Sequence, residues 1–192
     1  MKRSFIAITG ASGVLYGFSI IKAMQKAGFE VHTTAAAEAL HNAQAETGVK
    51  YNSIEEMYKA NGIENVILYN NNDLSSAAAS GSFKMENYII APASMGFVGR
   101  TANGISASLI ERCADVALKE RRPLIVLFRE MPLSTIHLEN LTKLSKSGAV
   151  IIPAAPGFYN RPETINDLVN FVTGKVLDVL GIENNCYKRW EN

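Results

Sequence analysis

Leu124-Ile125-Val126-Leu127-Phe128 is a run of five apolar residues that ends abruptly in the charged pair Arg129-Glu130. A short, continuous apolar run is typical of a strand buried on both faces, as in the parallel sheet of an α/β protein. Open parallel sheets bind their ligands in a crevice at the carboxyl ends of their strands. We therefore expect Arg129 and Glu130 to lie at a reaction site, because unpaired charges are costly to bury there.

Strands and helices alternate on both sides of this segment. The predicted strands are 4–9, 30–34, 66–69, 88–91, 124–128 and 149–152. The predicted helices are 14–27, 35–46, 54–60, 106–119, 137–147 and 165–180, and the polar segment 70–82 is expected to be a surface loop. This order predicts a single doubly wound, mostly parallel sheet of the Rossmann-like or flavodoxin-like type, with helices on both faces. Neither a repeat nor a linker divides residues 1–192, so one domain is expected.

Composition limits the classes of function. The formal net charge is +1 at pH 7, which favours neither nucleic acid nor an anionic membrane as a partner. No apolar run reaches the ~18 residues of a membrane span, and the first strand is too short for a signal peptide. We expect a cytoplasmic protein. Cys113 and Cys186 are far apart, and the histidines are not at metal-ligand spacing, so no metal site is predicted.

Small residues follow the first predicted strand as Gly10-Ala11-Ser12-Gly13. Such a loop lets a ligand approach the backbone, and the N-terminus of the next helix offers N–H groups to a phosphate. A tight turn that serves only packing explains the loop equally well. The glycines fall at 10, 13 and 17, not in the GxGxxG pattern, which argues against an NAD-dependent dehydrogenase. Two further small-residue segments, 79–82 and 91–97, favour the ligand interpretation.

Several charged residues have ordinary explanations when they are considered alone. Arg112, Asp115 and Lys119 share one face of a predicted helix, as a salt-bridged surface stripe would. Glu46 and Lys175 are typical of solvated helix residues. Tyr159 either hydrogen-bonds a substrate or fills the core.

Read together, these motifs resemble the flavin prenyltransferase family (UbiX-like), which belongs to the flavoprotein and cysteine-decarboxylase-like superfamily. The resemblance covers nearly the whole chain. It rests on segments 10–13 with 16–17, 79–82, 112–116 with 118–122, 129–133 with 136–140, 153–159, 167–169 and 189–190. It implies that a dimethylallyl group from dimethylallyl phosphate is joined to N5 and C6 of reduced FMN. The product, prenylated FMN, would serve a partner decarboxylase.

The resemblance also implies an assembly and a set of site residues. Members need no metal and resemble homododecamers with sites at subunit contacts, so the tail 182–192 is expected to contact a neighbouring subunit. The implied FMN-binding residues are Gly10, Ala11, Ser12, Ala36, Ser94, Met95, Gly96, Phe97 and Arg129. The implied residues for the prenyl phosphate are Tyr159 and Lys175. The implied catalytic residues are Glu46, Arg112, Lys119 and Glu130, of which the cations would stabilise the leaving phosphate and the carboxylates would handle protons.

The chain departs from the family pattern at the flavin and phosphate ends of the implied pocket. Many relatives have Cys-Ser-Met-Lys-Thr where this chain has residues 93–97, so a lysine is absent. Ala36 replaces a serine, Ala107-Ser108 replaces an Asp/Asn pair, and Lys175 replaces an arginine. Lysine keeps the charge but cannot form a bidentate phosphate contact.

Two other functions therefore stay open at this point. One is an FMN-binding carrier or accessory subunit of an aromatic-acid decarboxylase. The other is a flavin-dependent decarboxylase of the cysteine type.

Overall fold

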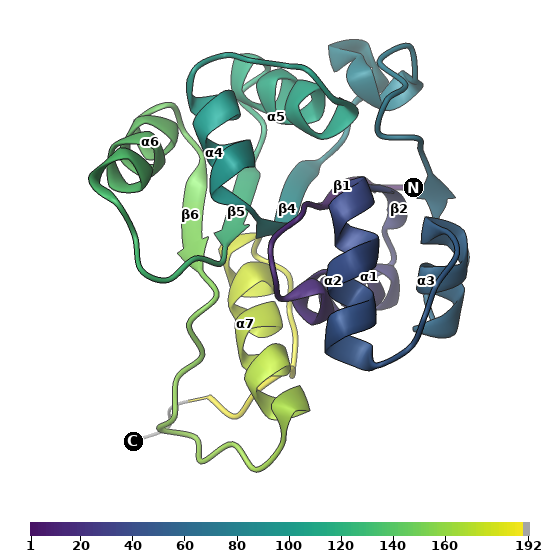
Figure 1. Ribbon diagram of the computed structural model, residues 1–192, viewed down its shortest axis with the longest axis vertical. Coiled ribbons are helices and arrows are strands. Elements are labelled where there is room, and N and C mark those ends of the chain that lie inside the picture. The colour runs from purple at the N-terminus through teal and green to yellow at the C-terminus, as the bar shows by residue number, and fades with distance from the viewer. Residues whose placement is uncertain (190–192) are drawn as a thin grey trace.

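The computed structural model describes residues 1–189 and contains one six-stranded sheet (Figure 1). Its strands are β1 (Arg3–Ile8), β2 (Glu30–Ala35), β3 (Ile67–Leu68), β4 (Asn87–Ala93), β5 (Leu124–Phe128) and β6 (Val150–Pro153). All neighbours pair in parallel, in the order β3-β2-β1-β4-β5-β6. The predicted doubly wound α/β fold is confirmed. The chain reverses its direction across the sheet between β1 and β4, and such a switch point is where open α/β sheets bind ligands.

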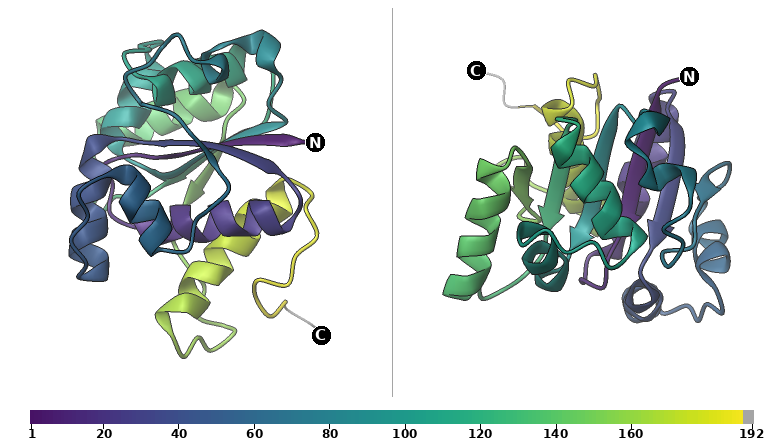
Figure 2. Two further views of the ribbon diagram at one scale, coloured as in Figure 1. Left: turned by 90° about the vertical axis from the view of Figure 1, so that its right-hand side faces the viewer. Right: turned by 90° about the horizontal axis from the view of Figure 1, so that it is seen from above.

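Helices cover both faces of the sheet. They are α1 (Val14–Lys26), α2 (Ala37–Thr47), α3 (Ile54–Ala60), α4 (Met95–Ala102), α5 (Leu109–Lys119), α6 (Thr135–Lys146) and α7 (Ile165–Val179). Figure 1 and Figure 2 show α4, α5 and α6 on one face and α1 and α7 on the other. Among residues 1–189, no helix is long and apolar enough to cross a membrane.

The two cores explain why β5 is apolar at every position. In β5, Leu124 and Val126 pack under α5, whereas Ile125 and Leu127 face the α1 and α7 side. Adjacent side chains of a strand point to opposite faces. A strand covered on both faces therefore needs apolar residues throughout, as the sequence predicted for this segment.

The small-residue segment 91–97, which was expected to be a loop, instead contains the end of β4 and the start of helix α4. Ser94 caps this helix, because its Oγ accepts a hydrogen bond from the Phe97 amide at 3.3 Å. Phe97 and Val98 then bury their side chains in the core. The sequence did not indicate this helix, because the helix has only eight residues and two of them are glycines, which have low helix propensity.

The segment 79–82 was expected to help bind a ligand, but in this chain it lies away from the carboxyl ends of the strands. It forms part of two short 3-10 turns, Ala77–Ala79 and Gly81–Phe83, that lead into the amino end of β4. Ala78 and Ala79 pack against α5, and a Cβ on Gly81 would lie 2.5 Å from Glu120 Oε1. The small residues here permit close packing near the amino ends of the strands, at the opposite end of the sheet from their carboxyl ends.

The described part of the C-terminal tail folds back on α7. Asp178 accepts hydrogen bonds from Asn184 Nδ2 at 2.9 Å, Tyr187 Oη at 2.6 Å and Arg189 Nη2 at 2.8 Å. Trp190 and the rest of the predicted tail contact lie outside the described residues. The contact of residues 182–189 with a neighbouring subunit stays a prediction.

Candidate functional site

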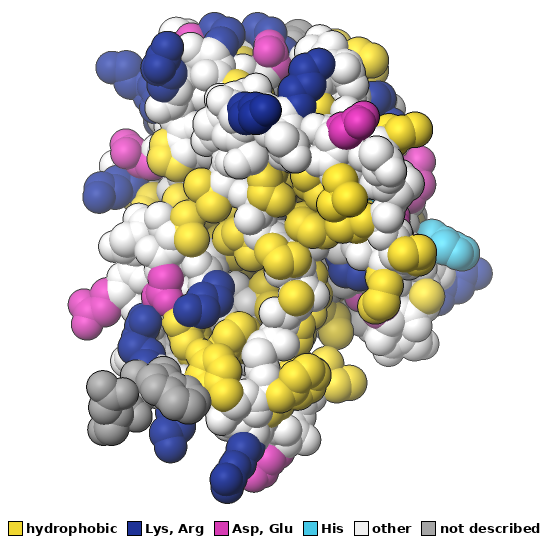
Figure 3. Space-filling view, turned by 90° about the vertical axis from the view of Figure 1, so that its left-hand side faces the viewer, with side chains coloured by type: hydrophobic (Ala, Val, Ile, Leu, Met, Phe, Trp, Pro, Cys, Tyr) yellow, Lys and Arg dark blue, Asp and Glu magenta, His cyan; other side chains and the backbone are white. Residues whose placement is uncertain are grey.

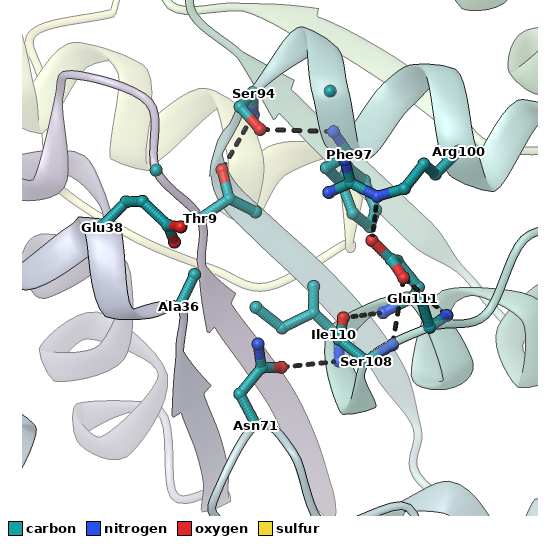
Figure 4. A pocket seen from close by; sticks show the side chains of 13 residues that line it. Thr9, Ala36, Glu38, Asn71, Ser94, Phe97, Arg100, Ser108, Ile110 and Glu111 are labelled. Atoms are coloured by element: carbon teal, nitrogen blue, oxygen red, sulfur yellow. Dashed lines mark hydrogen bonds and ion pairs between the residues drawn. The ribbon is translucent and has the colours of Figure 1, made fainter.

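A cavity of about 450 Å³ opens at the switch point, where β1, β2 and β4 end (Figure 4). Helices α4 and α5 close it from one side. Its lining residues are Thr9, Gly10, Ala36, Glu38, Asn71, Ser94, Gly96, Phe97, Arg100, Ala107, Ser108, Ile110 and Glu111.

Thr9 ties the ends of β1 and β4 together beneath this cavity. Its Oγ1 donates to the Pro92 carbonyl at 2.7 Å and accepts from the Ser94 amide at 2.8 Å. Gly10 follows, where a Cβ would lie only 2.7 Å from Glu38 Cβ. A glycine is therefore required for the chain to leave β1 alongside the first turn of α2.

The first turn of α4 presents donors to the cavity. The Phe97 amide donates a hydrogen bond to Ser94 Oγ. The amides of Met95 and Gly96 have no partner within the helix, because they belong to its first turn. The positive end of the helix dipole lies at the same place. Gly96 is exposed, so a ligand can approach its backbone directly. This arrangement suits an anionic group.

The wall of the cavity beside α4 includes a buried carboxylate from α5, Glu111. Glu111 is only 3% exposed, and its Oε2 accepts from the amides of Ala107 at 2.7 Å and Ser108 at 3.0 Å. Its Oε1 accepts from Arg100 Nε, which comes from α4. Arg100 is thereby held beside Gly96, with Nη1 3.3 Å from where a Cβ on that glycine would lie. Figure 4 shows this pair at the wall opposite Glu38.

The predicted phosphate loop after β1 is already bonded to a carboxylate of the chain. Glu46 Oε1 accepts from Ser12 Oγ at 2.8 Å and from the Gly13 amide at 2.5 Å. Glu46 therefore occupies the anion position at the N-terminus of α1. Burial raises the pKa of the Tyr16 hydroxyl, and the nearby charge of Glu46 raises it further.

Arg129 and Glu130 follow β5 directly, as the sequence indicated. The Arg129 amide donates to the Ala93 carbonyl at 3.4 Å, which places this residue next to the end of β4. Its Nε is buried without a hydrogen-bond partner among the described residues, and Glu130 is exposed. Arg129 therefore retains a buried donor beside the strand ends that form the cavity.

Arg112 and Lys119 lie outside the cavity. Arg112 is on a different side of α5 from Glu111, and Lys119 is at the other end of this helix. Arg112 donates to the Ala79 carbonyl at 3.2 Å and pairs with Asp115 at 3.0 Å, as the predicted stripe required. Lys119 pairs with Glu120 at 2.7 Å.

Tyr159 and Lys175 lie at α7, on the face of the sheet opposite α4 and α5. Tyr159 packs edge-on against Phe171 with ring centroids 5.7 Å apart, and it is 46% exposed. Lys175 Nζ lies 5.3 Å from the centre of the Tyr187 ring. Lys175 lines a second, mostly apolar cavity of about 500 Å³ between β6 and α7.

One chain thus brings together only part of the predicted site. Of the predicted FMN-binding residues, the cavity is lined by Gly10, Ala36, Ser94, Gly96 and Phe97. Ala11 and Met95 are buried, whereas Ser12 is exposed and bonded to Glu46.

Sequence reasoning missed Thr9, Glu38, Asn71, Arg100 and Glu111 as lining residues. Ser108-x-x-Glu111 is a readable capping-box signature. The pairing of Glu111 with Arg100 depends on how two helices pack and leaves no local signal. Among residues 1–189, no cluster of three or more His, Cys, Asp or Glu side chains could hold a metal ion.

The fold is that of a known class. A family model described as Flavoprotein matches residues 1–177. The chain is 42% identical to the flavin prenyltransferase UbiX of Aquifex aeolicus over 193 residues, which is 99% of each chain. Its structure is similar to that of AnUbiX (PadA1) in complex with FMN and dimethylallyl pyrophosphate, with a TM-score of 0.91 and 32% identity, covering 100% of this chain and 98% of that chain.

A second solved structure supports the same grouping. It is the dodecameric FMN-dependent UbiX-like decarboxylase from Escherichia coli O157:H7, with a TM-score of 0.90, 34% identity, and coverage of 99% of this chain and 100% of that chain. The chain belongs to the Flavoprotein family and, within it, to the flavin prenyltransferases of the UbiX type.

Proposed function

We propose that this chain is an enzyme that joins the dimethylallyl group of dimethylallyl phosphate to N5 and C6 of reduced FMN. The observation that carries the proposal is the cavity at the β1/β4 switch point, in a chain that matches flavin prenyltransferases over its whole length. A cysteine-type decarboxylase is not favoured, because the curated relative that matches 99% of the chain is a flavin prenyltransferase.

The chain's residues fit FMN at this cavity. The first turn of α4 and Arg100 supply donors and positive charge at one wall, and Arg129 Nε is a buried donor without a partner among the described residues. Small residues at Gly10, Ala36 and Gly96 leave room for a flat ring system to approach the backbone. When bound, reduced FMN supplies the nucleophilic ring atoms of the reaction.

The roles of the remaining residues follow from their chemistry. Cations at Arg112, Lys119 and Lys175 would stabilise the charge that develops on the leaving phosphate, and Tyr159 would hold that phosphate. Glu46 and Glu130 would accept or deliver the protons exchanged during ring closure. Glu46 is already hydrogen-bonded to Ser12, so Ser12 could relay a proton to Glu46 by donating its own hydroxyl proton as it accepts one from the flavin.

The separation of these groups is explained if neighbouring subunits complete each site. The side of the molecule that carries β6, α6 and α7 exposes a broad hydrophobic band (Figure 3). Exposed hydrophobic side chains from this part of the chain include Met131, Ile136, Leu138, Val150, Phe158, Ile165 and Val179. Monomeric proteins rarely expose large apolar patches. We therefore propose a homododecamer, in which this face meets other subunits and Tyr159 and Lys175 reach a neighbour's cavity.

The proposed product, prenylated FMN, would be delivered to a partner decarboxylase in the cytoplasm. The reaction can be tested by anaerobic incubation with reduced FMN and dimethylallyl phosphate, followed by mass spectrometry of the released flavin. The diphosphate donor is run in parallel. A gain of one C5 prenyl unit is the expected result.

Stoichiometric binding of FMN whose mass stays unchanged with both donors would refute the transferase proposal. The chain would then be a flavin carrier. The first variants to make would then restore the family residues at Ala36, Gly96 and Ala107.

A further inference from the structure

Arg100 is a cation at the cavity wall that the sequence motifs did not assign to any role. Its Nε is bonded to the buried carboxylate of Glu111, and its side chain is 49% exposed. Neither of its terminal nitrogens has a hydrogen bond to another residue within 1–189. The guanidinium is therefore held at one edge by the protein and presents its other edge to the cavity.

The buried partner fixes this orientation. Glu111 also accepts two backbone amides, those of Ala107 and Ser108, so it cannot turn without breaking three interactions at the start of α5. A carboxylate that is 3% exposed is costly to bury unless it is paired. Arg100 consequently loses little further conformational freedom when a ligand arrives, which favours binding.

The distribution of charge around the cavity favours an anionic group on the Arg100 side. The donors of Ser12 and Gly13 are taken by Glu46, so the loop after β1 cannot offer them to a ligand without displacing this carboxylate. Glu38 lines the wall opposite Arg100 and repels anions there. The free amides of the first turn of α4 lie on the Arg100 side. A planar guanidinium next to helix N–H groups matches the geometry of a phosphate.

We propose that Arg100, positioned by Glu111 and acting with the first turn of α4, binds the phosphate group of a ligand in this cavity. The phosphate belongs either to FMN or to the prenyl donor. The inference depends on the proposed function only for the identity of these two ligands, because binding can be measured without turnover.

The experiment compares Arg100→Gln and Arg100→Lys with wild type for the Kd of oxidised FMN and of riboflavin, followed by flavin fluorescence. Lys59→Gln is the matched control, since it removes an exposed positive charge from α3. Losing a hydrogen bond to a charged group corresponds to a roughly 10- to 100-fold weaker Kd. We expect this loss for FMN with Arg100→Gln, no loss for riboflavin, and partial recovery with Arg100→Lys.

A second arm identifies the source of the phosphate. If the Kd of FMN is unchanged in Arg100→Gln but the KM for dimethylallyl phosphate rises about 10-fold or more, Arg100 binds the donor phosphate instead, and the proposal stands. Equal weakening of FMN and riboflavin, or no change in any of these constants, overturns it. Unchanged FMN mass in the wild-type assay would refute prenyl transfer without affecting the FMN and riboflavin comparison.

The positioning role of Glu111 is tested by a double-mutant cycle. Glu111→Gln should weaken FMN binding when Arg100 is present and have no further effect in the Arg100→Gln background. Additive losses would show that Glu111 merely supports the fold. Thermal melting of each variant, including the neutral Arg100→Gln/Glu111→Gln pair, identifies any loss that comes from unfolding.

Discussion

Gly17 lets α1 pack closely against the backbone of β4. A Cβ on this glycine would lie 2.5 Å from the Ala91 carbonyl oxygen and 2.8 Å from the Ile8 side chain. Both neighbours are fully buried, so neither can move away freely. We expect Gly17→Ala to lower the free energy of unfolding by about 1–3 kcal/mol, the usual cost of overpacking. Denaturant titration measures this change.

Gly99 provides the matched control in α4. The nearest neighbour of a Cβ there would be Asn140 Nδ2 at 3.6 Å, an ordinary contact. Gly99→Ala should leave stability unchanged or raise it by up to about 1 kcal/mol through better helix propensity. Equal losses at both glycines would contradict close packing of α1 on β4 as the cause.

A substitution that keeps the size of Glu130 can distinguish a role in catalysis from a role in flavin binding. Glu130→Gln should leave the Kd of FMN close to the wild-type value but slow product formation by about 10²–10⁴-fold, if this carboxylate moves a proton during ring closure. Single-turnover kinetics measure the rate. Glu55→Gln, on the exposed side of α3, should have no effect. Normal turnover of Glu130→Gln would remove this residue from the mechanism.

At the scale of elements, Asp178 joins the C-terminal tail to α7. Its hydrogen bonds, first of all with Arg189 and then with Tyr187 and Asn184, lower the pKa of its carboxyl from 3.8 to about 2. A lowered pKa in the folded state means that the ionised form stabilises the fold. This contribution is complete above pH 3.8 and is lost as the pH falls towards 2.

We therefore expect Asp178→Asn to melt a few degrees below wild type at neutral pH, with the difference shrinking between pH 4 and pH 2. Thermal melting across this range measures it. Glu183→Gln is the control, because Glu183 is an exposed carboxylate in the same tail. A difference that stays constant down to pH 2 would show that the tail is not held by the ionised carboxylate.

At the scale of the whole molecule, the proposed sharing of sites between subunits predicts complementation. Arg129→Ala removes a group from the cavity side, and Lys175→Ala removes one from α7. Each variant alone should be strongly impaired. In a randomly mixed assembly, about a quarter of the shared sites contain both intact residues, because each site takes the two groups from different chains.

Co-expression of the two variants, purification of mixed oligomers and measurement of prenylated FMN test this arrangement. The control is a mixture of the two variants purified separately and not allowed to exchange subunits. Activity that fails to recover in mixed oligomers would mean that each chain supplies both residues to its own site.

The elements were largely predictable because each depends on neighbours in the sequence. The run Leu124–Phe128 predicted β5 without error. The predicted helix 106–119 begins instead at Leu109, because Ser108 caps it. The helix α4 was missed, since its apolar face is short and interrupted by Gly96 and Gly99.

The site was less predictable than the fold. The motifs identified the small residues at the strand ends and the charged pair after β5, but they did not indicate that Glu46 occupies the loop after β1. They also gave no sign of Arg100, whose importance depends on a partner eleven positions away on another helix.

The sequence by itself determined the parallel α/β fold, the family and the chemical types available at the strand ends, because apolar periodicity, turn residues and ordered motifs are local properties. Only the tertiary structure decided which of these groups meet. Glu46 is paired with the first loop and Arg100 with Glu111, whereas Tyr159 and Lys175 lie at α7 on the other face of the sheet. The physical reason is that hydrogen bonding and burial couple residues through space, where packing sets their distance and position along the chain does not.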